Sequence, residues 1–225
     1  MNISSSIRKP GSYTIIDDSG ANNALPSTRQ EMVIVAQRLA TGTVAKNISK
    51  TIANSEQAAT YWGAGSIMHR MAMAAFRQNP YLVLTGCAVD DNAAGVAATA
   101  TITFAGAATG AGSASLLIGN DPISIAILAA MTPAQAATAL AAEINKYVNL
   151  PVTASANAAV VTLTAKNKGT VGNLIGKYNA TSSKYEPSIS INAAGLTATV
   201  TGFTGGATDP ADADVSAAYA ALASK

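Results

Sequence analysis

The chain has 225 residues, of which 49% are hydrophobic, enough for one or two domains with hydrophobic cores. Charged residues make up only 12% and the net charge is +2, which argues against nucleic acid or an anionic membrane surface as the main partner. One cysteine, Cys87, and one histidine, His69, exclude an intramolecular disulfide framework and a Cys/His zinc site.

Residues 1–30 are predicted to form an extended arm. They show no helical periodicity, and their longest apolar group is Tyr13, Ile15 and Ile16. No apolar run follows Arg8 and Lys9, so the segment does not have the pattern of a signal peptide. Such an arm either adds a strand to a neighbouring molecule or is a disordered leader, and composition leaves both open.

Residues 31–94 are predicted to be the first part of a small α/β domain. The run from Met32 to Ala36 predicts a strand buried on both faces within residues 31–39, and residues 81–89 predict a second buried strand. Between them, residues 55–78 have helical spacing, with Asn54 or Ser55 as the cap and Pro80 beyond the end. One face of this helix carries Ile67, Met68, Met71 and Ala75. Strand, helix and strand in this order predict a parallel pair.

Residues 95–207 are predicted to be a β-rich inserted domain with one helix. Asp121 is the only charged residue from Asn92 to Ala142. Apolar and polar residues alternate in the segments predicted as strands, which are 98–104, 113–118, 123–128, 152–156, 160–165, 188–191 and 196–201. Thr132 and Pro133 open a helix with an apolar stripe of Ala136, Leu140, Ile144 and Val148.

Residues 208–225 are predicted to begin an alanine-rich helix, about 211–224, that returns to the first domain. The predicted fold class is therefore α+β or α/β: a small α/β domain interrupted by the inserted β-rich domain, with an extended N-terminal arm.

No pattern of residues indicates catalysis, a metal or a cofactor. His69 lies in the middle of an amphipathic helix, and Cys87 lies in an apolar run where a thiol is inert. Asp90 and Asp91 are adjacent and point to opposite faces of an extended segment, which favours a solvated turn over an acid/base pair. The glycines around residue 64 and before Lys177 match neither a dinucleotide nor a phosphate-loop motif. We therefore predict that the protein is not an enzyme.

An ordered set of short motifs resembles the contractile tail sheath proteins of Mu-like bacteriophages. The motifs cover nearly the whole chain and are IRKPGSY at 7–13, RQ at 29–30, YWGAGS at 61–66, NP at 79–80, DD at 90–91, AAGVAAT at 93–99, LPVTA at 150–154, VTLTAK at 161–166, KGTVGN at 168–173 and GGATDP at 205–210.

The resemblance implies a structural subunit that polymerises around a tail tube and contracts to drive the tube through the host envelope. Its partners would be neighbouring sheath subunits and the tail tube protein, without nucleic acid or membrane insertion. It would reside in the virion tail, and in the host cytoplasm during assembly. By resemblance, the arm contacts a neighbouring subunit through Ile7, Tyr13, Ile15 and Ile16, and residues 95–207 form a peripheral domain. Members of this family continue past the position of Lys225, so the resemblance also implies a shortened chain without the sheet that receives the arm.

The sequence leaves two other functions open. Residues 95–207 could be an adhesin or carbohydrate-binding β-domain, although the chain is only 5% aromatic. Catalysis ranks last, and it would require a defined activity that is lost on mutation of His69 or Asp91.

Overall fold

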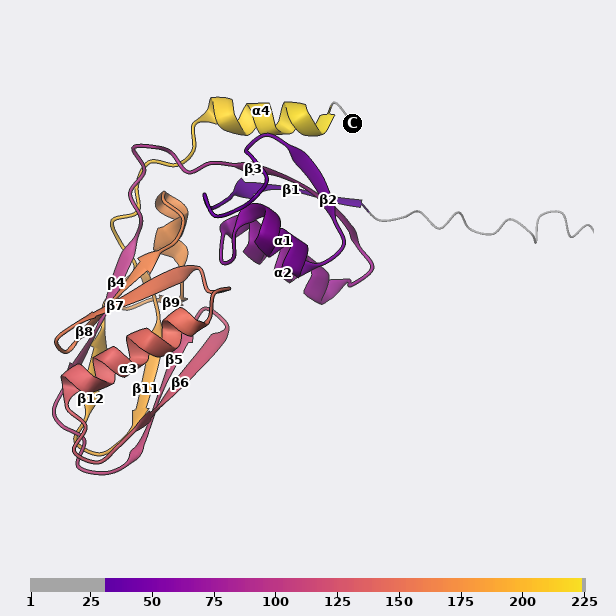
Figure 1. Ribbon diagram of the computed structural model, residues 1–225. Helices are drawn as coiled ribbons and strands as arrows, with labels where there is room; N and C mark the ends of the chain where they lie inside the picture. The colour runs from indigo at the N-terminus through magenta and orange to yellow at the C-terminus, as the bar shows by residue number, and fades with distance from the viewer. Residues whose placement is uncertain (1–30, 224–225) are drawn as a thin grey trace, which may run out of the picture. The chain divides into compact units, whose positions relative to one another are not determined.

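The computed structural model describes residues 31–223, which combine α-helices with several β-sheets, consistent with the predicted α+β class (Figure 1). The helices within this span are α1 (Ser55–Trp62), α2 (Ile67–Gln78), α3 (Pro133–Lys146) and α4 (Asp212–Ala223), with a short 3-10 helix at Thr170–Leu174. The strands are β1 (Glu31–Gln37), β2 (Ser49–Ile52), β3 (Val83–Val89), β4 (Thr99–Ala105), β5 (Gly112–Ile118), β6 (Asp121–Ile127), β7 (Val152–Asn157), β8 (Val160–Ala165), β9 (Lys177–Asn179), β10 (Lys184–Glu186), β11 (Ser188–Asn192) and β12 (Thr197–Val200).

The first sheet has the order β1-β3-β2. Strands β1 and β3 pair in parallel from Glu31 opposite Val83 to Gln37 opposite Val89, which confirms the predicted parallel pair. Strand β2 is antiparallel to β3 and was not predicted. Its sequence, SKTI, has one buried residue, Ile52, so no hydrophobic pattern marks it.

Helices cover both faces of this sheet, and we call residues 31–94 with α4 the α/β part. On one face, Ile34 and Leu84 pack with Trp62 of α1 and Met68 of α2. On the other face, Cys87 and Val89 form a smaller cluster with Ala218 of α4. Successive residues of β3 therefore serve opposite layers, as the alternation of side chains along a strand requires (Figure 1). The last helix, α4, thus packs on the sheet of this part of the chain through Ala218.

The predicted helix over residues 55–78 is wrong in one respect, because it is two helices. Gly63 and Gly65 between α1 and α2 have φ angles of 87° and 82°, a backbone conformation that favours glycine. Asn54, one of the two predicted caps, caps α1, and the Ser66 side chain caps α2 by accepting from the His69 amide at 3.0 Å. Helix α2 ends before Asn79, as Pro80 predicts.

The prediction that β1 is buried on both faces is also wrong at its start. Met32 and Val33 are 42% and 55% exposed, whereas Ile34 is buried. Among the described strands, β1 pairs only with β3 and lies at an edge of this sheet, where a side chain has fewer neighbours.

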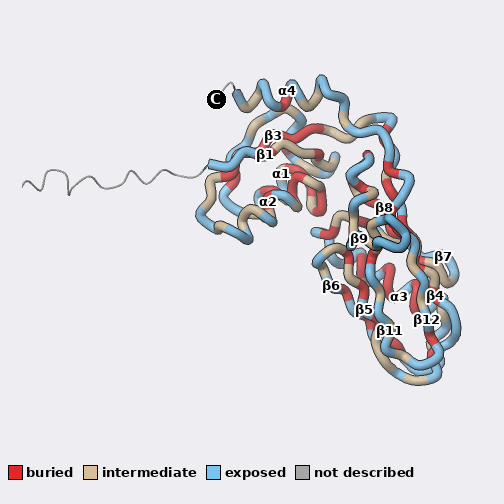
Figure 2. The backbone as a smooth tube through the Cα atoms, turned by 180° about the vertical axis from the view of Figure 1, so that it is seen from behind, coloured by how far each residue is buried: buried red, intermediate tan, exposed pale blue. Residues whose placement is uncertain are grey.

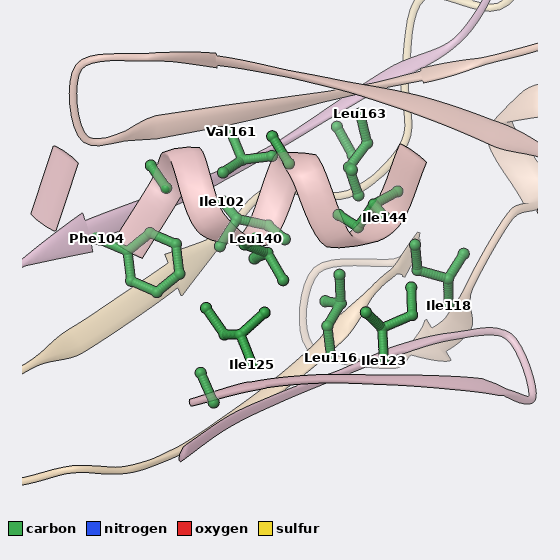
Figure 3. Packing of buried hydrophobic residues seen from close by; sticks show 14 of the residues in the cluster. Ile102, Phe104, Leu116, Ile118, Ile123, Ile125, Leu140, Ile144, Val161 and Leu163 are labelled. Carbon is green, nitrogen blue, oxygen red and sulfur yellow. The ribbon is translucent and has the colours of Figure 1, made fainter. Parts of the chain in front are cut away.

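The β-rich part, which we define as residues 95–207, has a hydrophobic core of its own. The two sheets have the orders β12-β4-β8-β7 and β11-β5-β6, and α3 packs its buried face against both of them (Figure 3). Leu140 and Ile144 of α3 are fully buried, and Thr132 and Gln135 form a capping box at its start. Val148, predicted on the same stripe, lies beyond the helix and is 59% exposed. Figure 2 shows buried positions in both parts, along β3 and α1 and along β4 and β5.

The chain enters and leaves the β-rich part along neighbouring segments. Isolated bridges pair Val96 with Ala207 and Thr99 with Thr204. The predicted strands of this part are present, and β7 and β8 form the predicted hairpin. The pairing of β9 with β10 was not predicted, since three-residue strands carry too little pattern.

Candidate functional site

The predicted contact residues of the arm, Ile7, Tyr13, Ile15 and Ile16, lie outside the residues that the structure describes. The other candidates, His69, Cys87, Asp90 and Asp91, lie within the described residues.

His69 is a buried structural residue of α2. It is 2% exposed, and its Nδ1 accepts a hydrogen bond from the Gly65 backbone N–H at 3.0 Å. Burial lowers the pKa of His69, and the nearby charges of Arg70 and Lys166 lower it further. The neutral imidazole therefore stabilises the turn between α1 and α2.

This geometry predicts a loss of stability in acid. The folded-state pKa of His69 lies below the unfolded-state value of 6.5, so the unfolded chain binds a proton first and stability falls as the pH decreases through this range. In a His69→Asn variant the amide oxygen lies where Nδ1 does, so it is expected to accept from the Gly65 N–H, but it does not titrate. We expect the melting temperature of the variant to depend less on pH than that of the wild type between about pH 5 and about pH 8. Identical pH profiles would show that His69 does not titrate differently in the folded state.

Cys87 is fully buried in β3, in the cluster with Val89 and Ala218. Burial raises the pKa of its thiol, which disfavours the reactive thiolate. The sequence-based expectation of an inert thiol agrees with this position.

The prediction of a solvated turn is wrong for Asp91, which is held in a part-buried network, whereas the Asp90 side chain is 43% exposed. Asp90 accepts a hydrogen bond from Arg38 Nε at 2.6 Å. Asp91 accepts from Gln37 Nε2 at 2.8 Å, from Asn167 Nδ2 at 2.9 Å and from the Lys168 backbone N–H at 2.9 Å. The two carboxylates serve different partners, and Asp91 links β1 to the loop after β8.

Sequence reasoning missed Gln37 and Asn167, which are 5% and 6% exposed. A polar residue at the end of an apolar strand is a signal for Gln37. Asn167 stands in a glycine-containing loop, where its type alone predicts a turn.

Within residues 31–223, no three His, Cys, Asp or Glu side chains are grouped so that they could hold a metal ion. None of the helices in this span is long and apolar enough to cross a membrane.

An open groove of about 840 Å³ lies between α1, the loop after β1 and the β7–β8 hairpin. Lys166 lines it, and Lys166 Nζ donates to the carbonyl oxygens of Val148 at 2.6 Å and Ala64 at 3.3 Å. Burial lowers the pKa of this lysine. The remaining lining is mostly small or apolar: Leu39, Ala40, Thr41, Thr43, Ala59, Thr60, Gly63, Ala64, Val148, Thr153 and Ala165.

The outward faces of the two sheets in the β-rich part carry hydroxyl and small side chains. On the four-stranded sheet the outward positions are mostly hydroxyl residues, namely Thr99, Thr101, Thr103, Thr153, Ser155, Thr162, Thr164, Thr197 and Thr199, together with Ala105, Asn157 and Val160. On the three-stranded sheet they include Ser113, Ser115, Ser124, Ala126, Ser188 and Ser190. These positions carry neither charges nor the aromatic rings that typically line carbohydrate sites.

Strand β1 offers a second surface. Among the described strands it pairs only with β3, so its other edge carries backbone groups outside the ladder, and Met32 and Val33 are exposed nearby. Uncharged sheet faces and an open strand edge suit contacts with other protein chains.

Comparison with known protein sequences finds similarity to a phage tail sheath protein. The chain is 29% identical over 226 residues to the Mu-like prophage FluMu tail sheath protein of Haemophilus influenzae. The alignment covers 98% of this chain and 44% of that protein, so the chain spans less than half the length of this relative. The resemblance to tail sheath proteins of Mu-like phages is thereby confirmed, and the extent of the match fits an N-terminal portion.

No protein-family model matches the chain. Among solved structures, the D1-D2-D3 domains of the flagellar cap protein FliD from Escherichia coli align with 60% of this chain and 53% of that chain at 17% identity. The TM-score of 0.26 is too low to support an argument about fold or function.

Proposed function

We propose that the chain is part of a structural subunit of a bacteriophage contractile tail sheath, which polymerises around the tail tube and contracts to drive the tube through the host envelope. The observation that carries the proposal is the similarity to a tail sheath protein along 98% of the chain. The partners would be neighbouring sheath subunits and the tube protein, and the location would be the virion tail after assembly in the host cytoplasm.

The surfaces of the β-rich part are compatible with this role. We propose that residues 95–207 form a peripheral domain inserted into the sheath domain, which the neighbouring entry and exit segments support. Contacts made by uncharged faces can be exchanged during contraction without the cost of desolvating ion pairs. A non-catalytic role is supported by the structural bonds in which His69 and Asp91 are engaged.

Residues 1–30 are proposed to be the arm that joins a neighbouring subunit, with Ile7, Tyr13, Ile15 and Ile16 as its contacts. We expect deletion of residues 2–28 from the gene product at its natural length to abolish ordered sheaths in negative-stain electron micrographs. A double variant, Ile15→Asp with Ile16→Asp, is expected to have the same effect, because two charges would have to be desolvated in the contact.

The matched control for the arm is Ser4→Asp with Ser5→Asp, which adds the same charge outside the apolar group and should leave sheaths intact. Normal sheaths from the deletion variant would contradict the proposed role of the arm.

A further inference from the structure

We infer that Gln37, Asp91 and Asn167 form a polar clasp that locks the β-rich part against the α/β part, so that the two move as one rigid body. The three residues are far apart in sequence, and their side chains meet where the end of β1, the end of β3 and the loop after β8 converge.

Asp91 is the centre of the clasp. Its Oδ1 accepts hydrogen bonds from Gln37 Nε2 and Asn167 Nδ2, and its Oδ2 accepts from the Lys168 backbone N–H. Two of the three donors belong to the loop after β8, which is part of the β-rich part. Hydrogen bonds to an ionised carboxylate are stronger than neutral ones, so this group contributes more than its small area indicates.

Both the oxygen and the nitrogen of the Asn167 side-chain amide form hydrogen bonds to the α/β part. Its Oδ1 accepts from the Ile67 backbone N–H at 3.0 Å, at the first turn of α2, and its Nδ2 donates to the Arg38 carbonyl oxygen at 3.0 Å as well as to Asp91. Gln37 completes the ring by donating to the Lys168 carbonyl oxygen at 2.8 Å. Both amide nitrogens, the Asn167 Oδ1 and both oxygens of Asp91 thus have partners in this part-buried group, which favours a single arrangement.

Two further contacts join the same two parts. Arg70 of α2 pairs with Asp121 of β6 at 2.6 Å, and Lys166 Nζ donates to the Ala64 carbonyl oxygen. Close packing adds to them, because a Cβ on Gly65 would lie 2.2 Å from the Leu150 carbonyl oxygen.

The clasp changes what the connecting segments do. Two neighbouring segments, around residues 92–98 and 204–210, carry the chain between the parts, and by themselves they would act as a hinge. Contacts at several separated points remove that freedom. This consequence rests on the proposed function in a contractile sheath. There, force applied to the β-rich part would be transmitted to the α/β part and would not be absorbed by bending between them.

A distance measurement between spin labels tests the clasp on the 225-residue chain. Glu56→Cys on α1 and Ala142→Cys on α3 place labels at exposed positions on the two parts, while buried Cys87 is expected to stay unlabelled. We expect a single narrow distance distribution in the otherwise unchanged chain. Asp91→Asn, which turns an acceptor into a donor facing other donors, is expected to lose that narrow peak.

Hydrogen exchange supplies a second readout. The Lys168 amide, which donates to Asp91, should exchange at least about tenfold faster in Asp91→Asn. The matched control is Asp90→Asn, which removes the same charge one residue away, where the carboxylate bonds only to Arg38 in the described contacts, and should keep both signals unchanged.

A narrow distribution with unchanged Lys168 exchange in Asp91→Asn would overturn the inference, as would a broad distribution in the parent chain. If Asp91→Asn does not fold, Asn167→Asp is used in its place, because it puts a second carboxylate against Asp91. The same distance distribution and the same Lys168 exchange rate are then measured. Both measurements use the isolated chain, so their failure is distinguishable from failure of sheath assembly.

Discussion

Replacing Gly86 by valine is expected to lower the free energy of unfolding by about 3 kcal/mol, at the upper end of the usual cost of overpacking a core. Gly86 lies in β3 beneath α1 and α2, and a Cβ there would lie 2.5 Å from Cη2 of Trp62 and 2.4 Å from Cε of Met68. The methionine end can rotate away, but the indole is rigid and fully buried. Trp62, the only tryptophan of the chain, would have to move.

Urea unfolding followed by Trp62 fluorescence measures this loss, because the emission of the single indole reports on the α/β part. Gly110→Val is the matched control, since a Cβ at Gly110 meets nothing within 4 Å. Equal midpoints for Gly86→Val and the parent chain would contradict the packing of β3 against Trp62.

Replacing Leu140 by alanine is expected to destabilise the chain by about 3 kcal/mol, as in other large-to-small substitutions at buried sites. Leu140 is fully buried on α3, and Figure 3 shows it among Ile102 of β4, Leu116 of β5 and Ile125 of β6. Residues from both sheets surround it, so the cavity cannot close without distorting one of them.

Thermal unfolding followed by circular dichroism tests this expectation. Leu128→Ala is the matched control, because Leu128 is 66% exposed and the same atoms are removed from a solvated position. A Leu140→Ala variant as stable as the control would contradict the packing of α3 against both sheets. If the clasp couples the two parts, Trp62 fluorescence should also report the Leu140→Ala loss in the same transition.

Regular, strongly patterned elements were predictable from sequence. The alternation in β4, β5 and β8 and the Thr132–Pro133 start of α3 identify them without tertiary information, because one face of each is apolar and the other polar. The parallel pairing of β1 with β3 follows from the strand, helix and strand order.

The helix predicted over residues 55–78 and the missed strand β2 failed for two different physical reasons. Helical periodicity continues across residues 55–78, so the break appears only in the glycines at 63 and 65, whose positive φ angles are a backbone property. Strand β2 lacks a hydrophobic pattern because it lies at the sheet edge.

The role of Asp91 could not be predicted from its neighbours. Its partners, Gln37 and Asn167, are 54 and 76 residues away, and only the folded chain brings them together. Two adjacent aspartates give the same sequence pattern whether they are solvated or hydrogen-bonded. Because aspartates are mostly exposed, the pattern alone predicts a solvated turn.

The most direct test of the sheath assignment is negative-stain electron microscopy of the gene product at its natural length, overproduced without other phage proteins. The proposal predicts long, hollow, striated tubes. A natural-length product that stays dispersed across salt and protein concentrations, and that also forms no sheath when the tail tube protein is added, would contradict it.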